Sequence, residues 1–170
     1  MKNLFLIGYM GTGKSTVASY LAKQYDLDIV EMDQVIVERE GKSIEDIFAT
    51  HGENYFRDIE SKLLEDIQSE KNKVVSCGGG VVLRDQNVTV MKKSGHIVLL
   101  TAVPQTILER VKDDEARPLL KGNKTVEFIQ DMMEKRRPYY ESAADVVIDT
   151  DGKTVACICD EIMKKTKEIC

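Results

Sequence analysis

A run of glycines, one lysine and hydroxyl side chains near the start of the chain has the spacing of a phosphate-binding loop. The run is Gly8-Tyr9-Met10-Gly11-Thr12-Gly13-Lys14-Ser15, which matches the pattern G-x-x-x-x-G-K-[ST]. Chance produces such a match in under roughly 1% of chains of this length. Glycines let backbone N–H groups surround a phosphate, and the start of a helix adds partial positive charge there. The alternative, a glycine-rich turn with a solvated lysine, is disfavoured, and the motif predicts a nucleoside triphosphate site.

Two side chains of this loop have separate expected roles. Lys14 would reach the β- and γ-phosphates, and the hydroxyl of Ser15 would be a ligand of Mg²⁺, the cofactor that we expect. The residues expected around the phosphates are Gly11, Thr12, Gly13, Lys14, Ser15 and Thr16. The base-reading motif of G proteins, Asn-Lys-x-Asp, is absent because Asn72-Lys73 is followed by Val74-Val75. The chain is also short for a motor with a second domain, so a small-molecule kinase is favoured.

A kinase must hold an acceptor opposite the γ-phosphate, and candidate residues cluster at the expected strand ends. Asp33 follows the second strand and Gly78-Gly79-Gly80 the third, while Arg57 lies on the long helix and Arg136 ends a helix near Pro138. Each has a plainer explanation. The aspartate could cap a helix, and the first arginine could pair with Glu53 or Glu60 on its own helix. The glycines could form a simple turn, and the second arginine could complement a helix C-terminus. Together these explanations do not account for arginines placed beside strand-end glycines in an acidic chain.

The elements that must position these residues alternate between strand and helix patterns. Strands are expected at residues 4–7, 28–32, 74–76, 96–100 and 146–148. Helices are expected at residues 12–24, 53–69, 85–93, 104–111, 125–136 and 153–167, with a short one opened by the capping box Ser43-x-x-Asp46. This alternation predicts an α/β fold with a parallel sheet and helices on both faces. Active sites of such sheets lie at the carboxyl ends of the strands.

Residues of about 112–124 break the alternation. They carry charges together with Pro118, Gly122 and Asn123. A loop of about a dozen residues is uncommon in a compact domain and often acts as a lid over an active site. A mobile lid is the preferred interpretation, and an ordinary surface loop is the alternative.

Length and charge limit the remaining possibilities. The 170 residues, 42% of them hydrophobic, suggest a single domain over residues 1–170. The net charge of −5 without a large basic block argues against nucleic acid or an anionic membrane as a partner. No apolar run approaches the roughly 20 residues that span a bilayer. The glycine-rich run follows the N-terminus too closely for a signal peptide, so a cytoplasmic protein is expected.

Several longer motifs are similar to one known family. They are Asp33-x₇-Gly41-Lys42-Ser43-Ile44-x₂-Ile47-Phe48-x₃-Gly52-Glu53-x₂-Phe56-Arg57-x₂-Glu60, Gly78-Gly79-Gly80-Val81-Val82, Arg117-Pro118-Leu119-Leu120 and Arg136-x-Pro138-x-Tyr140. In order and spacing these motifs closely resemble the shikimate kinases, over nearly the whole chain. The resemblance implies a three-layer αβα fold of P-loop kinase type with a five-stranded parallel sheet. It also implies ATP-dependent phosphorylation of the 3-hydroxyl of shikimate, on the route to chorismate and aromatic amino acids.

The resemblance assigns roles on the acceptor side of the site. Asp33 would bind ring hydroxyls and orient the attacking one, with Lys14 and Arg117 as further catalytic residues that stabilise the phosphoryl group. Arg57 and Arg136 would bind the carboxylate of shikimate, while the backbone at Gly79 and Gly80 would contact the substrate. A carboxylate is held best by planar guanidinium groups, which agrees with these roles.

On the nucleotide side, Arg110 and Lys153 would lie near the adenine, and Arg117 would also bind ATP. Ser15 would hold Mg²⁺ directly and Glu31 would hold it through water. The family usually has Asp-x-Asp where this chain has Glu31-Met32-Asp33, so the metal ligand is one methylene longer here. We expect ATP and shikimate as the only partners of a monomeric protein.

Two other functions stay open at this point. The same scaffold could phosphorylate another small hydroxy acid, such as gluconate. The chain could also be a regulatory module that binds a nucleotide without catalysis. Such a module should lack Lys14, Asp33 or one of the two arginines, and this chain has all of them.

Overall fold

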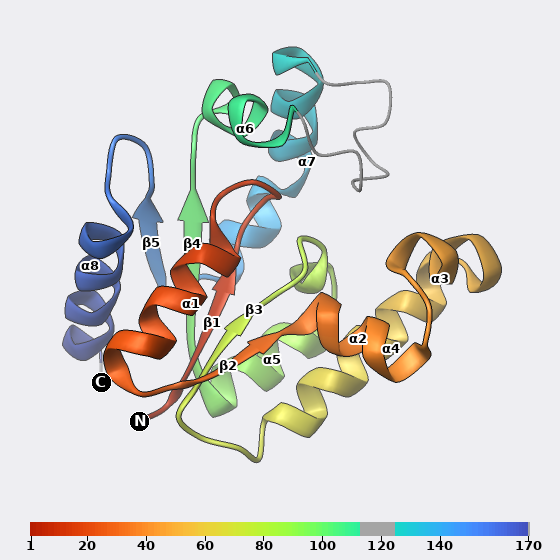
Figure 1. Cartoon of the computed structure of the whole chain (residues 1–170), viewed down its shortest axis with the longest axis horizontal. Helices are drawn as coiled ribbons and strands as arrows, with labels where there is room; N and C mark the ends of the chain where they lie inside the picture. The colour runs from red at the N-terminus through yellow and green to blue at the C-terminus, as the bar shows by residue number, and fades with distance from the viewer. Residues whose placement is uncertain (113–124, 170) are drawn as a thin grey trace.

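A computed structural model describes residues 1–112 and 125–169 of the chain. Within them, one sheet of five parallel strands has the order β2-β3-β1-β4-β5 (Figure 1). The strands are β1 (Asn3–Ile7), β2 (Asp28–Glu31), β3 (Lys73–Ser76), β4 (Gly95–Thr101) and β5 (Val146–Asp149). The expected fold class, an αβα fold with a five-stranded parallel sheet, is confirmed.

Helices cover both faces of this sheet. They are α1 (Lys14–Tyr25), α2 (Met32–Glu40), α3 (Ile44–His51), α4 (Glu53–Ile67), the 3₁₀ helix η1 (Val81–Leu83), α5 (Asp85–Ser94), α6 (Pro104–Val111), α7 (Val126–Ala143) and α8 (Val155–Glu168). Figure 1 shows α1 and α8 together on the near face of the sheet, with α5 behind it. The side chain of Ser43 accepts a hydrogen bond from the N–H of Asp46, as expected for a helix that begins at this point.

The central strand β1 separates two hydrophobic cores. Leu4 and Leu6 pack with the apolar faces of α1 and α8, whereas Phe5 and Ile7 pack with residues from the helices on the other side. Each residue of β1 is buried because both faces of the strand are covered and both edges are paired, Phe5 lying between Val75 and Ile97. Near-continuous apolar strands are typical of such covered parallel sheets. This packing fixes the carboxyl end of β1, from which the phosphate-binding loop begins.

The structure corrects the expected end of one helix. A helix ending at Arg136 was predicted from Pro138, but α7 continues through this proline to Ala143. A proline inside a helix removes one backbone hydrogen bond and introduces a steric clash. Here the buried side chains of Tyr140 and Ala143 beyond the proline stabilise the additional turns. Arg136 therefore lies within α7, so its interpretation as a charge at a helix C-terminus is wrong.

The helix that carries Asp33 does not begin at that residue. Met32 is the first residue of α2 and Asp33 lies in its first turn, while Glu31 occupies the position before the helix. The plainer explanation of Asp33 as a helix cap is therefore wrong. The lid expected over residues 112–124 lies outside the described residues, except for Lys112 at the end of α6.

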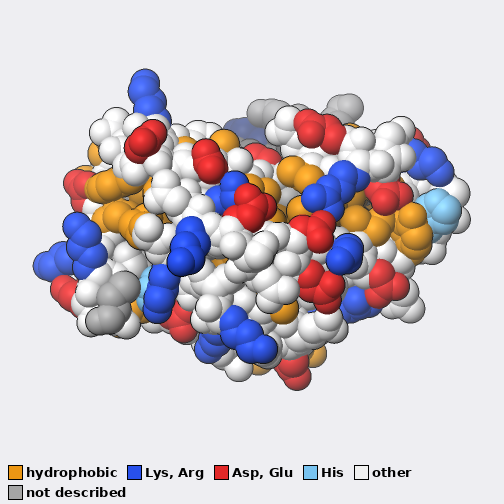
Figure 2. All heavy atoms as spheres, turned by 90° about the horizontal axis from the view of Figure 1, so that it is seen from below, with side chains coloured by type: hydrophobic (Ala, Val, Ile, Leu, Met, Phe, Trp, Pro, Cys, Tyr) orange, Lys and Arg blue, Asp and Glu red, His pale blue; other side chains and the backbone are white. Residues whose placement is uncertain are grey.

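The surface carries charges of both signs. Figure 2 views the molecule from below the orientation of Figure 1, at the end where the strands begin, and shows basic and acidic side chains spread over that face. Among the described residues, no helix is long and apolar enough to cross a membrane.

Candidate active site

The phosphate-binding loop connects β1 to α1, as the motif predicted. Gly11 and Gly13 have φ angles of 77° and 93°, which side chains other than glycine rarely adopt. A Cβ atom at Gly11 would also lie 2.8 Å from Cγ1 of Val111 on α6. Both the backbone conformation and the neighbouring side chain therefore favour glycine at this position. The hydroxyl of Thr12 is buried and donates to the carbonyl of Tyr9 at 2.8 Å. The loop is therefore held in shape before any ligand binds.

The lysine of the motif lies across this loop. Nζ of Lys14 donates to the carbonyls of Gly8 at 2.7 Å and Tyr9 at 3.1 Å. Both acceptors belong to the loop itself, so the ammonium group lies over the segment that would surround a phosphate. Thr16 follows on the first turn of α1 and is exposed.

Three oxygen-bearing side chains meet beside the lysine. The hydroxyl of Ser15 donates to a carboxylate oxygen of Glu31 at 2.9 Å and lies 3.4 Å from the hydroxyl of Ser76. These residues belong to α1, β2 and β3, which end or begin at the same edge of the sheet. Mg²⁺ prefers oxygen ligands and usually keeps one or two from the protein beside phosphate and water oxygens. The donor set therefore fits Mg²⁺, and the longer side chain of Glu31 reaches this position.

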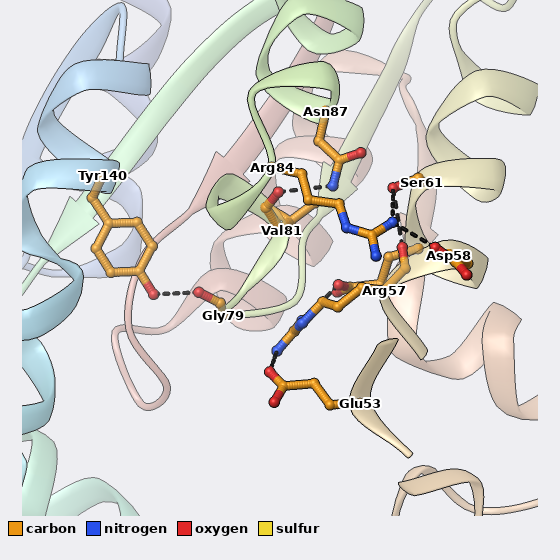
Figure 3. Close-up of polar contacts among 10 residues, drawn as sticks. Glu53, Arg57, Asp58, Ser61, Gly79, Val81, Arg84, Asn87 and Tyr140 are labelled. Carbon is orange, nitrogen blue, oxygen red and sulfur yellow. Dashed lines mark hydrogen bonds and ion pairs between the residues drawn. The ribbon is translucent and has the colours of Figure 1, made fainter. Parts of the chain in front are cut away.

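On α4, an arginine and a glutamate form a shielded ion pair. Nη1 of Arg57 lies 2.6 Å from Oε1 of Glu60, whose side chain has no exposed surface, while the arginine side chain is 11% exposed. Figure 3 shows the same arginine extending toward Glu53, which it contacts at 3.3 Å. Both pairings considered from the sequence are therefore present. They do not exclude a role in binding, because the guanidinium also reaches the glycine run.

The three consecutive glycines after β3 allow charged side chains from three helices to approach one short stretch of backbone. A Cβ atom at Gly80 would lie 2.5 Å from Cζ of Arg57, and one at Gly79 would lie 3.2 Å from Nη1 of Arg136. A Cβ atom at Gly78 would similarly lie 3.3 Å from Oδ1 of Asp33. Elements α2, α4 and α7 thus bring together the acceptor-side residues that the sequence singled out: Asp33, Arg57, Gly79, Gly80 and Arg136.

Sequence reasoning assigned Glu60 no place in the site. Its second carboxylate oxygen is buried without a hydrogen-bond partner among the described residues and lies next to Gly78. Burial raises the pKa of Glu60 above its ordinary value and the charge of Asp33 adds to this, whereas the guanidinium groups of Arg57 and Arg136 act in the opposite direction. A signal was available, because Glu60 lies on the apolar stripe of α4. The buried members of that stripe are Phe56, Leu63, Leu64 and Ile67.

The residues expected near the adenine are less closely gathered. Nη1 of Arg110 on α6 donates to the carbonyl of Gly11 at 3.0 Å and to the hydroxyl of Thr150 at 3.4 Å. It therefore connects the phosphate-binding loop with the segment that follows β5. Lys153 in that segment pairs with Glu161 of α8 at 2.6 Å, and this hydrogen bond raises the pKa of the lysine. Arg117, expected in the lid, lies outside the described residues.

The phosphate-binding loop and the two arginines lie at the same edge of a parallel sheet, an arrangement that defines a P-loop kinase acting on a small anionic acceptor. Comparison with known proteins identifies the group more closely. The chain belongs to the shikimate kinase family, whose model matches residues 10–167. The shikimate kinase of Thermodesulfovibrio yellowstonii is 43% identical over 169 residues, which is 99% of this chain and 97% of that protein. The resemblance found in the sequence is confirmed.

Solved structures agree with this assignment. A shikimate kinase from Acinetobacter baumannii in complex with shikimate has a TM-score of 0.93 and 29% identity, covering 99% of this chain and 94% of that one. A gluconokinase from Sinorhizobium meliloti has a TM-score of 0.62 at 18% identity, covering 99% and 93% of the two chains. The second likeness shows a shared fold alone. The family model and the relatives that match over the whole chain identify the chain as an enzyme of the kinase class.

Proposed function

We propose that this chain transfers the γ-phosphoryl group of ATP to the 3-hydroxyl of shikimate, giving shikimate 3-phosphate and ADP. The observation that carries the proposal is the approach of Arg57 and Arg136, from two helices, to adjacent glycines at the sheet edge that holds the phosphate-binding loop. Two planar guanidinium groups suit a carboxylate, and shikimate is a carboxylic acid with ring hydroxyls. We expect the two arginines to hold its carboxylate and the backbone of Gly79 and Gly80 to contact its ring.

In this proposal Asp33 orients the attacking hydroxyl. The hydroxyl oxygen bonds to the γ-phosphorus as the bond to the β,γ-bridging oxygen breaks, and its proton passes to Asp33 or to solvent. Lys14, held over the phosphate-binding loop, would stabilise the charge on the transferred group. Phosphoryl transfer depends mostly on positioning and charge stabilisation, which these two side chains would supply. By family resemblance, Arg117 would add a second positive charge from a lid at residues 112–124.

The proposal also assigns residues on the nucleotide side of the site. Mg²⁺ would be held by Ser15 directly and by Glu31 through water, and when bound it would neutralise charge on the phosphate oxygens. Arg110, already in contact with the phosphate-binding loop, and Lys153 would face the adenine. We further propose that the chain acts as a single-domain monomer in the cytoplasm, where ATP is available.

The acceptor carboxylate offers a direct test of the two arginines. Phosphorus NMR of a reaction with Mg·ATP and shikimate should show one new phosphate monoester, and mass spectrometry should show one added phosphoryl group. The methyl ester of shikimate keeps the three hydroxyls but loses the negative charge. Because loss of a charge-assisted contact costs about 1.5 kcal/mol or more, its KM should rise at least about ten-fold. An equal KM for acid and ester would contradict the proposed role of Arg57 and Arg136.

A further inference from the structure

Tyr140 connects α7 to the glycine run, and neither the motif nor the proposed reaction assigns it a role. Its side chain is 5% exposed, and its hydroxyl donates a hydrogen bond to the carbonyl of Gly79 (Figure 3). The tyrosine lies one helical turn after Arg136 on α7. Adjacent turns of α7 therefore carry Arg136, a proposed substrate ligand, and Tyr140, whose side chain hydrogen-bonds the backbone beside that ligand.

The carbonyls of the three glycines are held in different ways. Gly78 accepts a hydrogen bond from the N–H of Val81 at 3.2 Å, and Gly80 accepts one from the N–H of Leu83 at 3.1 Å. These two bonds lie within the turn that leads into η1. The carbonyl of Gly79 is held instead by Tyr140, from an element 61 positions away in the sequence. The middle residue of the run thus owes its orientation to a side chain of α7.

The hydroxyl of Tyr140 and the guanidinium of Arg136 both lie beside Gly79. Nη1 of Arg136 lies 3.2 Å and the hydroxyl of Tyr140 lies 3.7 Å from the position of a Cβ atom on Gly79. Burial raises the pKa of Tyr140 above its ordinary value, although the positive charge of Arg136 acts to lower the pKa of the phenol. The phenol therefore stays protonated near neutral pH and donates to Gly79 beside the guanidinium of Arg136.

The backbone of α7 is weakened where this contact occurs. Pro138 lies between Arg136 and Tyr140 and has no N–H, so the carbonyl of Glu134 receives no helical hydrogen bond from it. A side-chain contact at the next turn compensates by fixing this part of α7 against the sheet edge. The position of Arg136 then depends on Tyr140 more than it would in an uninterrupted helix.

We propose that Tyr140 is a positioning residue of the acceptor site, which holds Gly79 and the guanidinium of Arg136 at a fixed separation. It need not touch the substrate. This inference rests on the proposed function, because it assumes that Gly79 and Arg136 bind the acceptor. An ordinary core tyrosine would instead affect folding without favouring one substrate over the other.

The test compares Tyr140→Phe with Tyr139→Phe. Each variant loses one hydroxyl from α7, but Tyr139 is 47% exposed and serves as the matched control. Because Phe retains the buried ring, Y140F should fold, and its thermal unfolding is measured first. We expect the KM for shikimate to rise about ten-fold in Y140F, with the KM for ATP unchanged, because the carbonyl of Gly79 loses its hydrogen bond and the backbone beside Arg136 is no longer held. Y139F should match the wild type in both constants.

Two further measurements separate positioning from general damage. If Tyr140 acts through Arg136, the rise in shikimate KM for the double variant Y140F/R136K should be smaller than the product of the two single effects. Without any substrate, amide hydrogen exchange in residues 78–83 should be faster in Y140F than in Y139F. An unchanged shikimate KM in Y140F, with an active wild type, would overturn this inference alone. A wild type inactive with shikimate would contradict the proposed function and remove the basis of the inference with it.

Discussion

The guanidinium of Arg57 is held 2.6 Å from the carboxylate of Glu60, a side chain with no exposed surface. The arginine also lies over the ring of Phe56, with Cζ 5.3 Å from its centre. A long side chain of this kind is ordinarily free to adopt several conformations. Here the buried carboxylate and the ring confine it against Gly80, so the guanidinium is in place before an acceptor arrives. Glu60 therefore orients the guanidinium of Arg57, and its negative charge offsets part of the positive charge that the arginine offers to an acceptor.

The first prediction concerns the pH dependence of stability. Burial raises the pKa of Glu60, so the folded chain binds this proton more tightly than the unfolded chain does. The contribution of Glu60 to the free energy of unfolding is therefore fully present below its unfolded pKa and declines as the pH rises through its folded pKa. Chemical denaturation between about pH 4.5 and about pH 8 should show the wild type losing stability relative to Glu60→Gln.

The control for this effect is the other partner of Arg57. Glu53 is 60% exposed and lies 3.3 Å from the arginine, so Glu53→Gln removes an exposed partner of the same guanidinium and should change the free energy of unfolding at neutral pH by less than about 1 kcal/mol. A difference between wild type and E60Q that stays constant with pH would show that Glu60 titrates as an ordinary carboxyl group.

The second prediction concerns Gly80, where an added methyl group tests the contact with Arg57. In Gly80→Ala the new Cβ atom would lie 2.5 Å from Cζ of Arg57, and the ion pair with Glu60 resists displacement of the guanidinium. We expect the KM for shikimate to rise by about ten-fold or more, with the KM for ATP unchanged.

Gly41→Ala is the matched glycine control. Gly41 has a φ of 65° but no atom near its would-be Cβ, so this variant should lose about 1 kcal/mol of stability and keep both KM values. If G80A also changed only stability, Arg57 would have no part in acceptor binding.

The third prediction separates binding from turnover at Asp33. Asp33→Asn keeps the size of the side chain, but the neutral amide cannot take up the proton and accepts a hydrogen bond less strongly than a carboxylate does. Turnover should fall about a hundred-fold or more, as expected for loss of a general base, while ATP affinity measured by calorimetry is retained. Turnover within a factor of two of the wild type would refute a catalytic role for this aspartate.

The fourth prediction concerns Glu31, the proposed water-mediated ligand of Mg²⁺, which departs from the family pattern. Glu31→Gln removes a negative charge beside Ser15, so the Mg²⁺ concentration that gives half-maximal activity should rise several-fold at fixed ATP. Glu31→Asp keeps the charge and should stay close to the wild type, because a water molecule can bridge the shorter reach. Equal Mg²⁺ dependence in wild type and E31Q would show that Glu31 does not contribute to metal binding.

Most of the fold could be predicted from the sequence. Each observed strand coincides with an expected apolar run to within two residues at either end, because strands covered on both faces have near-continuous apolar sequences. The end of α7 could not be predicted. Pro138 is a strong local signal for helix termination, and the burial of Tyr140 that outweighs it depends on tertiary packing.

The site was only partly accessible to sequence reasoning. Asp33 after β2 and the glycine run after β3 follow the rule that sites lie at the carboxyl ends of parallel strands, whereas Arg57 and Arg136 reach that edge from within α4 and α7. Glu60 was missed because its spacing from Arg57 is equally that of a surface ion pair, although its place on the apolar stripe of α4 indicated burial. Only the fold shows that Tyr140 meets Gly79.

The central claim is that this enzyme phosphorylates shikimate, and the most direct measurement is ADP release from Mg·ATP with shikimate, quinate, gluconate or no acceptor. We predict strong stimulation by shikimate and little by the other acids, because the arginines and the glycine run fit a compact cyclic carboxylate. Stimulation by gluconate or quinate in place of shikimate would contradict the acceptor assignment while leaving the kinase fold intact. No stimulation by any of the acids, in a protein that still binds ATP, would contradict the account as a whole.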